Sequence, residues 1–340
     1  MIAPPPGYRD ANGPLRIVAI GGGTGLSSLL HGLKEYARQG QADICAIVTV
    51  TDDGGSSGRL RREFAILPPG DIRNCMVALS EDEALLSQLF QYRFSSGRGL
   101  KGHSFGNLFL TALTHVTGDF PHAVRLSSEV LAIYGRIYPS TSQNVGLRAT
   151  MTDGTTVEGE TRISKSRKRI ARLELTPTKV KPLKDALEAI AAADLITLGP
   201  GSLYTSVIPN LLVDGIASAI RRSRATRAYF ANLMWQPWET MYYSASEHLN
   251  AMIDHGGKGL VDVAILNTTP VTGARRRLYA AEKVFPVALD IPLIEEMGIK
   301  TLGSPLLAKG EKVRHDSSAI ARVAMELAST SRLRRNLASR

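Results

Sequence analysis

The sequence predicts an α/β protein with a doubly wound, mostly parallel sheet and a small antiparallel β insertion. Short runs rich in valine and isoleucine alternate with segments whose apolar residues have helical spacing. Polar or glycine-rich residues follow each such run. This order is typical of parallel sheets with helices on both faces, in which ligands lie beyond the carboxyl ends of the strands.

The first strand, at 16–20, leads into a glycine turn and then a helix with Leu26, Leu29, Leu30 and Leu33 on one face. Further strands are expected at 44–50, 194–198, 228–233 and 261–267. Further helices are expected at 72–79, from near 108, and at 182–193.

Alternating segments between 146 and 175 predict the β-rich insertion, with Asp153-Gly154 as a hairpin turn. The start of the chain is polar and proline-rich, and the pattern becomes less regular beyond residue 302. We therefore expect a disordered tail at 1–14, one α/β domain at 15–325 and a basic C-terminal tail at 326–340.

The formal net charge is +10, and much of the excess lies in clusters at 165–169, 275–277 and 331–340. Such clusters are usually solvated surface. Nucleic acid is not expected as a partner, because aromatic content is 6% and no stacking pattern accompanies the charge. An anionic small ligand is another use for positive charge.

Cys45 and Cys75 are the two cysteines, and neither has a CxxC partner, so we expect buried, reduced thiols. No run of about 18 apolar residues predicts a membrane span. The first ten residues lack the apolar core of a signal peptide. We expect a cytoplasmic protein.

Two glycine-rich turns are candidate phosphate sites, because glycine lets main-chain N–H groups approach an anion. The first contains Gly21, Gly22, Gly23, Thr24 and Gly25. The second, which is the stronger local signal, contains Gly199, Pro200, Gly201, Ser202, Tyr204 and Thr205. Each is also compatible with a tight strand-to-helix turn. Asn232 and Asn267 end later strands, where they could bind a base or ribose or simply form turns.

Two acidic loops offer further candidates. Asp52, Asp53, Gly54, Ser56 and Ser57 could hold Mg²⁺, a hydroxyl-rich ligand or a phosphate, or could form an acidic turn that caps the next helix. Asp71 and Asn74 follow in a segment that also fits a simple helix N-cap. Among the histidines, His103 lies in a glycine loop and could act as an acid or base. The other histidines show no metal-ligand spacing, and no catalytic triad can be argued.

Several strings in the same order resemble the gluconeogenesis factor family, within the larger CofD-like group that includes 2-phospho-lactate transferase. They cover most of the chain and read IGGGTG at 20–25, DDGGSSG at 52–58, PPGDIRN at 68–74, GHSFGN at 102–107, LGPGSLYTSVIPN at 198–210 and RHD at 314–316. The resemblance implies a Rossmann-like sheet and adds Asn107 to the candidate nucleotide-binding residues.

The resemblance also implies a regulator that binds a UDP-sugar, UDP-N-acetylglucosamine in particular. Such a regulator acts on cell shape and on cell-wall precursor supply during growth on gluconeogenic carbon sources. Tyr279 and Arg314 are the best matches to the family's UDP-sugar contacts. The expected partner is an enzyme of amino-sugar or cell-wall precursor synthesis, and a homo-oligomer is compatible with the sequence. Trp235 and Trp238 replace small residues of the family, which puts ligand selectivity in question.

Three functions remain open at this point. A non-catalytic UDP-sugar sensor needs no resident cofactor. A CofD-like transferase would move a phospho-lactyl-type group from a nucleotide donor, with Mg²⁺ held by Asp53. A nicotinamide dehydrogenase is disfavoured, because Asp43 precedes the second strand instead of ending it.

Overall fold

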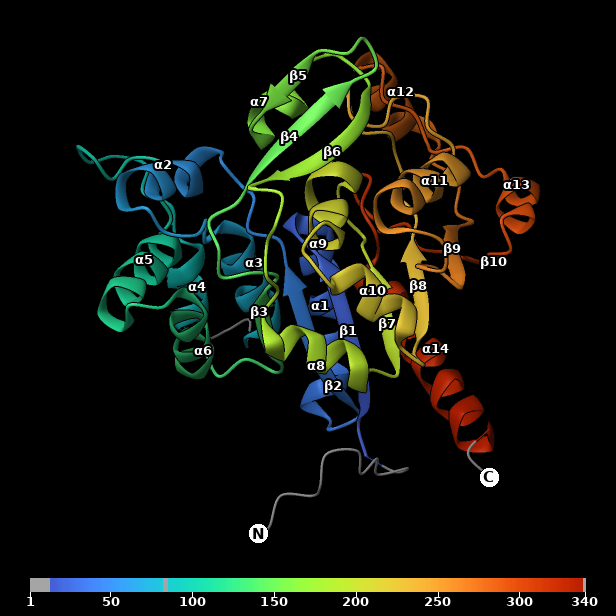
Figure 1. Cartoon of the computed structure of the whole chain (residues 1–340), viewed down its shortest axis with the longest axis horizontal. Coiled ribbons are helices and arrows are strands. Elements are labelled where there is room, and N and C mark those ends of the chain that lie inside the picture. The colour runs from blue at the N-terminus through green and yellow to red at the C-terminus, as the bar shows by residue number, and fades with distance from the viewer. Residues whose placement is uncertain (1–12, 82–84, 339–340) are drawn as a thin grey trace.

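The computed structural model describes residues 13–81 and 85–338. Its centre is a seven-stranded sheet in which every neighbouring pair is parallel (Figure 1). In spatial order the strands are β10 (Lys300–Ser304), β9 (Val263–Asn267), β8 (Thr226–Phe230), β7 (Leu195–Leu198), β1 (Leu15–Gly21), β2 (Ala42–Val48) and β3 (Arg136–Pro139). The predicted doubly wound sheet is confirmed. The tail expected at 1–14 lies outside the described residues as far as residue 12.

The strand order changes direction between β1 and β7. From β1 the chain adds β2 and β3 on one side, and it later adds β7, β8, β9 and β10 on the other. Ile20 is paired with Leu198 near the carboxyl ends of these two strands. Because ligands of doubly wound sheets bind where the order reverses, the two glycine turns lie at the edge where a ligand is expected.

Helices cover both faces of the sheet. One layer contains α1 (Gly23–Arg38), α3 (Gly70–Leu79) and α14 (Ser317–Ala338), with α1 packed against the other two. The other contains α8 (Lys184–Ala192), α9 (Ile208–Leu211) and α10 (Ile216–Arg222), which lie in front of the sheet in Figure 1. The buried residues of α1 include the leucines expected from helical spacing, Leu26, Leu29, Leu30 and Leu33.

The remaining helices form two groups near the edges of the sheet (Figure 1). The group nearer β3 contains α2 (Gly55–Phe64), α4 (Leu85–Gln91), α5 (Phe105–Thr117) and α6 (Phe120–Val130). The group nearer β9 and β10 contains α11 (Ala245–Gly256), α12 (Gly273–Ala281) and α13 (Ile291–Glu296). Side-chain caps fix several starts: Ser104 accepts from the Asn107 N–H at the start of α5, and Ser244 and Glu247 form a capping box on α11.

The predicted antiparallel insertion is a three-stranded sheet at one end of the molecule (Figure 1). Its strands are β4 (Gly146–Met151), β5 (Thr156–Glu158) and β6 (Ile170–Thr176), in the spatial order β5-β4-β6. A short helix, α7 (Glu160–Ser164), interrupts it where only strands were expected. Figure 1 shows this sheet beyond the end toward which the arrowheads of the central strands point.

The prediction of a basic tail at 326–340 is wrong for the residues that the structure describes. They continue α14, and Ala328 and Ser331 are buried. Arg332 and Arg335 both pair with the buried carboxylate of Asp194. The basic residues looked like a solvated tail because the sequence does not reveal that Asp194, far away in the chain, lies beside them.

Within the described part of the chain, no single helix is long and apolar enough to cross a membrane. Two consecutive helical segments, 203–211 and 216–222, are together long and apolar enough for a membrane span, but their axes are bent by 76° relative to each other. The first part of this pair is buried in the core.

Candidate functional site

The two glycine turns lie in contact at the carboxyl ends of β1 and β7. A Cβ atom on Gly25 would come within 2.4 Å of the Pro200 carbonyl oxygen, so only glycine fits there. Gly23 has a φ of +62°, in the left-handed region that glycine adopts without strain. The glycines are therefore needed for the close contact of two loops that are distant in sequence.

These turns present main-chain donors with no partner. The N–H groups of Thr24 and Gly25, in the first turn of α1, have no acceptor among the described residues. The same holds for Gly201 and Ser202 in the second turn. Unpaired N–H groups at a helix start and a glycine turn favour a negatively charged ligand.

A cavity of about 250 Å³, which we call the nest cavity, lies against both turns. Its remaining walls are the segment 232–236, which follows β8, and the segment 313–315, which precedes α14. The expected residues that line this cavity are Gly22, Gly23, Thr24, Gly25, Pro200, Gly201, Ser202, Asn232 and Arg314. The sequence thus predicted the two turns that form one side of the cavity. It did not indicate Ser28, Ser206, Met234 and Gln236, because no motif marks them.

Polar side chains from the 232–236 segment hold the second turn. Asn232 Nδ2 donates to the Gly201 carbonyl oxygen at 3.1 Å. Gln236 Oε1 accepts from the Leu203 N–H at 3.3 Å, and its Nε2 donates to Ser202 Oγ. These amides fix the turn, and they lie where they could also reach a ligand in the cavity.

Arg314 is the exposed cation of this cavity. Beside it, His315 Nε2 is 3.2 Å from the Ala231 carbonyl oxygen, and burial lowers the pKa of His315 to about 4. A neutral His315 at physiological pH is therefore a donor to the main chain, and Arg314 supplies the charge that would meet a diphosphate.

Tyr279 lies outside the lining of this cavity. Its hydroxyl accepts from the Val313 N–H at 3.1 Å, and its ring packs with Met234, Val271 and Val284. Tyr279 thus supports the segment that carries Arg314. Direct contact of the tyrosine with a UDP-sugar stays a prediction.

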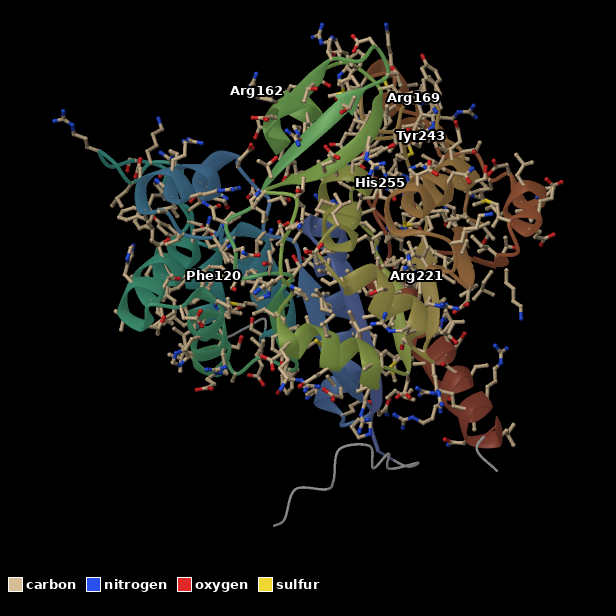
Figure 2. The ribbon with its side chains drawn as sticks, viewed as in Figure 1. Phe120, Arg162, Arg169, Arg221, Tyr243 and His255 are labelled. Carbon is tan, nitrogen blue, oxygen red and sulfur yellow. The ribbon has the colours of Figure 1, made fainter. Side chains whose placement is uncertain are left out.

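Tyr204 and Thr205 lie outside the lining of the cavity. Both are buried in a π-helical turn, Leu203–Val207, and neither lines the cavity. Tyr204 Oη lies 2.9 Å from Tyr243 Oη. The Arg169 guanidinium lies 4.7 Å from the centroid of the Tyr243 ring, and Figure 2 labels these two residues next to each other. Burial raises the pKa of Tyr204, so its hydroxyl stays neutral. The expected contact of these two residues with a nucleotide stays a prediction, and Ser206 of the same turn lines the cavity instead.

Asp71 lies directly behind the first turn. A Cβ atom on Gly22 would come within 2.6 Å of Asp71 Oδ2, and Asp71 accepts a hydrogen bond from the Gly23 N–H. Burial and the nearby charge of Asp52 raise the pKa of Asp71 to about 6. This carboxyl therefore supports the turn and holds a proton more readily than an ordinary aspartate.

Ser56, Ser57 and Asn107 belong to a separate buried network. Ser56 Oγ lies 3.0 Å from His103 Nδ1, and Asn107 Nδ2 donates to Ser56 Oγ at 3.2 Å and to Ser57 Oγ at 3.5 Å. Burial lowers the pKa of His103. The loops at 52–58 and 102–107, which the sequence separates, are thus bound to each other, but these residues do not line the nest cavity.

The acidic residues do not form a preformed metal site. Asp53 Oδ1 accepts from the Thr161 N–H and hydroxyl at 2.9 and 2.6 Å, and Asp52 Oδ1 accepts from the Gly54 N–H at 2.9 Å. Glu160, a neighbour that sequence reasoning missed, is half-buried, and desolvation and the charge of Asp52 raise its pKa well above the usual range. Among the residues that the structure describes, no three histidine, cysteine, aspartate or glutamate side chains are grouped to hold a metal.

The two tryptophans that depart from the family pattern differ in their positions. Trp235 lines the nest cavity, and its ring packs against Tyr242 at 4.8 Å and Phe285 at 5.3 Å between centroids. Trp238 is 39% exposed, with the Arg167 guanidinium 5.5 Å from its ring centroid. Asn74 and Asn267 also lie outside the lining of the nest cavity.

Comparisons with known proteins show which family the chain resembles over most of its length. The sequence model of the 2-phospho-L-lactate transferase CofD family matches residues 17–307. The chain is 48% identical to the gluconeogenesis factor of Halalkalibacterium halodurans, covering 91% of this chain and 95% of that protein. It is 45% identical to the gluconeogenesis factor of Bacillus subtilis, covering 92% and 98%. A crystal structure of a Bacillus halodurans protein superposes with a TM-score of 0.89 at 47% identity, covering 92% and 99%.

Proposed function

This chain belongs to the gluconeogenesis factor family and carries its CofD-type domain, and from that premise we propose that it is a regulator that binds a UDP-sugar, UDP-N-acetylglucosamine in particular. The observation that carries the proposal is the meeting of two glycine turns, with four unpaired N–H groups, in one cavity that Arg314 also lines. A diphosphate offers acceptors to the N–H groups and two negative charges to the arginine.

The apolar part of the same cavity supports a nucleotide ligand. Leu233, Met234 and Trp235 lie opposite the turns. An indole ring offers a face for stacking on a uracil base, and the amides of Asn232 and Gln236 offer hydrogen bonds to its polar edge. These contacts would bind and orient a nucleotide without a catalytic group, which is sufficient for a sensor.

We propose that the bound and free forms differ in their contact with an enzyme of amino-sugar or cell-wall precursor synthesis, in the cytoplasm. Through that contact the protein would affect cell shape and precursor supply during growth on gluconeogenic carbon sources. Cys45 and Cys75 are both buried free thiols, which suits a reducing compartment.

Calorimetry tests the proposal directly. UDP-N-acetylglucosamine is expected to bind with one site per chain, more tightly than GDP or NAD, and to raise the melting temperature. At a hundred times the dissociation constant the gain in stability is about 2.7 kcal/mol. Equal or absent responses to all three compounds would contradict it.

A transferase remains the second candidate, favoured by the CofD family match and by the half-buried acidic groups Asp52, Asp71 and Glu160, of which Asp71 contacts the first glycine turn. The described residues do not fit a preformed Mg²⁺ site, so no step is assigned to the metal. Product formation from a nucleotide-lactyl donor, lost in Asp53→Asn, would establish this function and displace the sensor.

A further inference from the structure

A second cavity, of about 580 Å³, adjoins the nest cavity. It lies between α1, α3, the residues after α4 and the start of α14, and it shares Thr24, Ser28 and Arg314 with the nest cavity. Arg73, Arg93 and Arg314 all line it. None of its described lining residues is an aspartate or glutamate, so its walls carry a strong positive charge. We refer to it as the arginine cavity.

Arg73 is the least exposed of these cations. Its Nε is buried without a hydrogen-bond partner among the described residues, while Nη2 donates to Asn74 Oδ1. Burial and the positive charge of Arg93 lower the pKa of Arg73, and Asp71 and Asp52 offset only part of this. Buried polar groups normally have partners, so Arg73 carries a donor that the described residues leave unsatisfied.

The chain fixes both arginines in place. A Cβ atom on Gly106 would come within 2.9 Å of Arg73 Cδ and 2.8 Å of the Phe90 carbonyl oxygen, so this glycine makes room for the Arg73 stem. Arg93 Nη1 donates to the Gly102 carbonyl oxygen at 2.7 Å. The 102–107 loop therefore positions two like charges near each other, an arrangement that an anion between or beside them would stabilise.

The nest cavity alone is small for a nucleotide sugar, because ligand pockets usually measure about 300–1,000 Å³. A ligand whose diphosphate lies on the turns would extend past Arg314 into the arginine cavity. A neutral hexose there would leave Arg73 and Arg93 without a counter-charge.

We propose that the arginine cavity binds an oxyanion, a carboxylate or phosphate group, beside a nucleotide sugar whose diphosphate lies on the glycine turns; this inference rests on the proposed function for the nucleotide sugar. The oxyanion comes either from the sugar itself, as in a sugar acid, or from a separate small anion. Both sources present the same two or three oxygens to the guanidinium groups.

Matched ligands show whether the oxyanion belongs to the sugar or to a separate anion. UDP-glucuronate and UDP-glucose differ in one carboxylate, and we expect the first to bind about tenfold more tightly if the sugar carries the anion. If the anion is separate, inorganic phosphate is expected to tighten UDP-N-acetylglucosamine binding by a similar factor, measured by calorimetry in a buffer free of other oxyanions.

Arg93→Gln is the test variant and Arg98→Gln is its control, because Arg98 is exposed on the same loop but does not line the cavity. Arg93→Gln is expected to abolish the preference for UDP-glucuronate, or the tightening by phosphate, while leaving the affinity for UDP-glucose within about twofold. Arg98→Gln is expected to leave the oxyanion effect and the affinity for UDP-glucose unchanged. Arg73→Lys is a second variant, which keeps the positive charge but loses the planar guanidinium that can make two parallel hydrogen bonds to one oxyanion. The effect of the oxyanion on affinity is expected to fall in this variant too.

Equal affinity for UDP-glucuronate and UDP-glucose, together with no effect of phosphate, overturns the inference and leaves the proposed function intact. If no UDP compound binds, the proposed function fails. The cavity is then judged by phosphate alone: a rise in melting temperature that Arg93→Gln removes supports the oxyanion site, and no rise overturns it.

Discussion

Gly25 lies so close to Pro200 that the two glycine turns form one structure. A Cβ atom at position 25 would approach the Pro200 carbonyl oxygen to 2.4 Å and the Gly201 Cα to 2.7 Å. All of these atoms are main chain, so no side-chain rotation relieves the contact. The geometry of each glycine turn therefore depends on the other.

Gly25→Ala is expected to separate the turns. The inserted methyl group would displace the main chain, lowering the free energy of unfolding by about 2–4 kcal/mol and abolishing UDP-sugar binding. Urea unfolding and calorimetry measure the two effects. Gly146→Ala is the control, because the nearest atom to its added Cβ lies 3.9 Å away. Equal stability of the two variants would show that the turns tolerate separation.

Arg314→Ala is expected to weaken UDP-N-acetylglucosamine binding by about 10- to 100-fold, since a charge-assisted pair with phosphate is lost. The side chain is exposed, so the melting temperature without ligand should stay nearly unchanged. Arg276→Ala, at an exposed position on α12, serves as the charge-matched control. Unchanged affinity in calorimetry would reject the role of Arg314.

Tyr279→Phe tests whether Tyr279 supports the segment that carries Arg314 or contacts the ligand directly. The phenylalanine keeps the ring but removes the hydroxyl that accepts from the Val313 N–H. If Tyr279 acts by holding the segment of Arg314, affinity should fall several-fold, by about 1 kcal/mol for one hydrogen bond. If the ring itself stacks on the ligand, Tyr279→Phe should bind normally and Tyr279→Leu should not.

The sequence predicted the sheet well because strand, turn and helix patterns are local. Leu26, Leu29, Leu30 and Leu33 are buried as their spacing indicates, and the glycine turns lie at the predicted edge. Tyr204 lies outside the lining of the cavity, in a π-helical turn that has no local sequence signal.

Much of the site could not be predicted because it depends on contacts between distant segments. Glu160 lies near Asp52 only because the β insertion folds over the sheet edge. Gln236 reaches Ser202, and Arg73 packs against Gly106, across separate loops. A single sequence shows the residue types but not these contacts, so the nearness of Glu160 to Asp52 and the arginine cavity emerged only from the structure.

The stability of the protein is expected to depend on pH through His315. Burial lowers its pKa to about 4, below the usual value of about 6.5. The folded state favours the neutral ring, so its contribution is complete above about pH 6.5 and is lost as the pH falls toward 4. The loss is at most about 3 kcal/mol.

His315→Gln removes this titration and keeps a donor for the Ala231 carbonyl oxygen. The variant is expected to lose less stability than the wild type between about pH 7 and pH 4.5. Urea unfolding at both pH values measures the difference. Parallel losses in the two proteins would mean that other groups cause the acid sensitivity.

Removal of residues 326–340 is expected to destabilise the whole domain. The deletion takes away the buried Ala328 and Ser331, and it removes Arg332 and Arg335 from the buried carboxylate of Asp194. Asp194 then keeps the Arg16 N–H, at 2.8 Å, as its donor. Breaking a buried ion pair by removing one partner costs about 3–5 kcal/mol.

Two companion variants assign the cause of that loss. Removal of 336–340 keeps both arginines, so its free energy of unfolding should stay within about 0.5 kcal/mol of the wild type. Asp194→Asn should destabilise the full chain but restore part of the stability of the shortened one, since it removes the uncompensated buried charge. If the shortened chain gains nothing from Asp194→Asn, packing of α14 alone accounts for the loss. If the shortened chain is as stable as the wild type, the end of α14 does not anchor the domain.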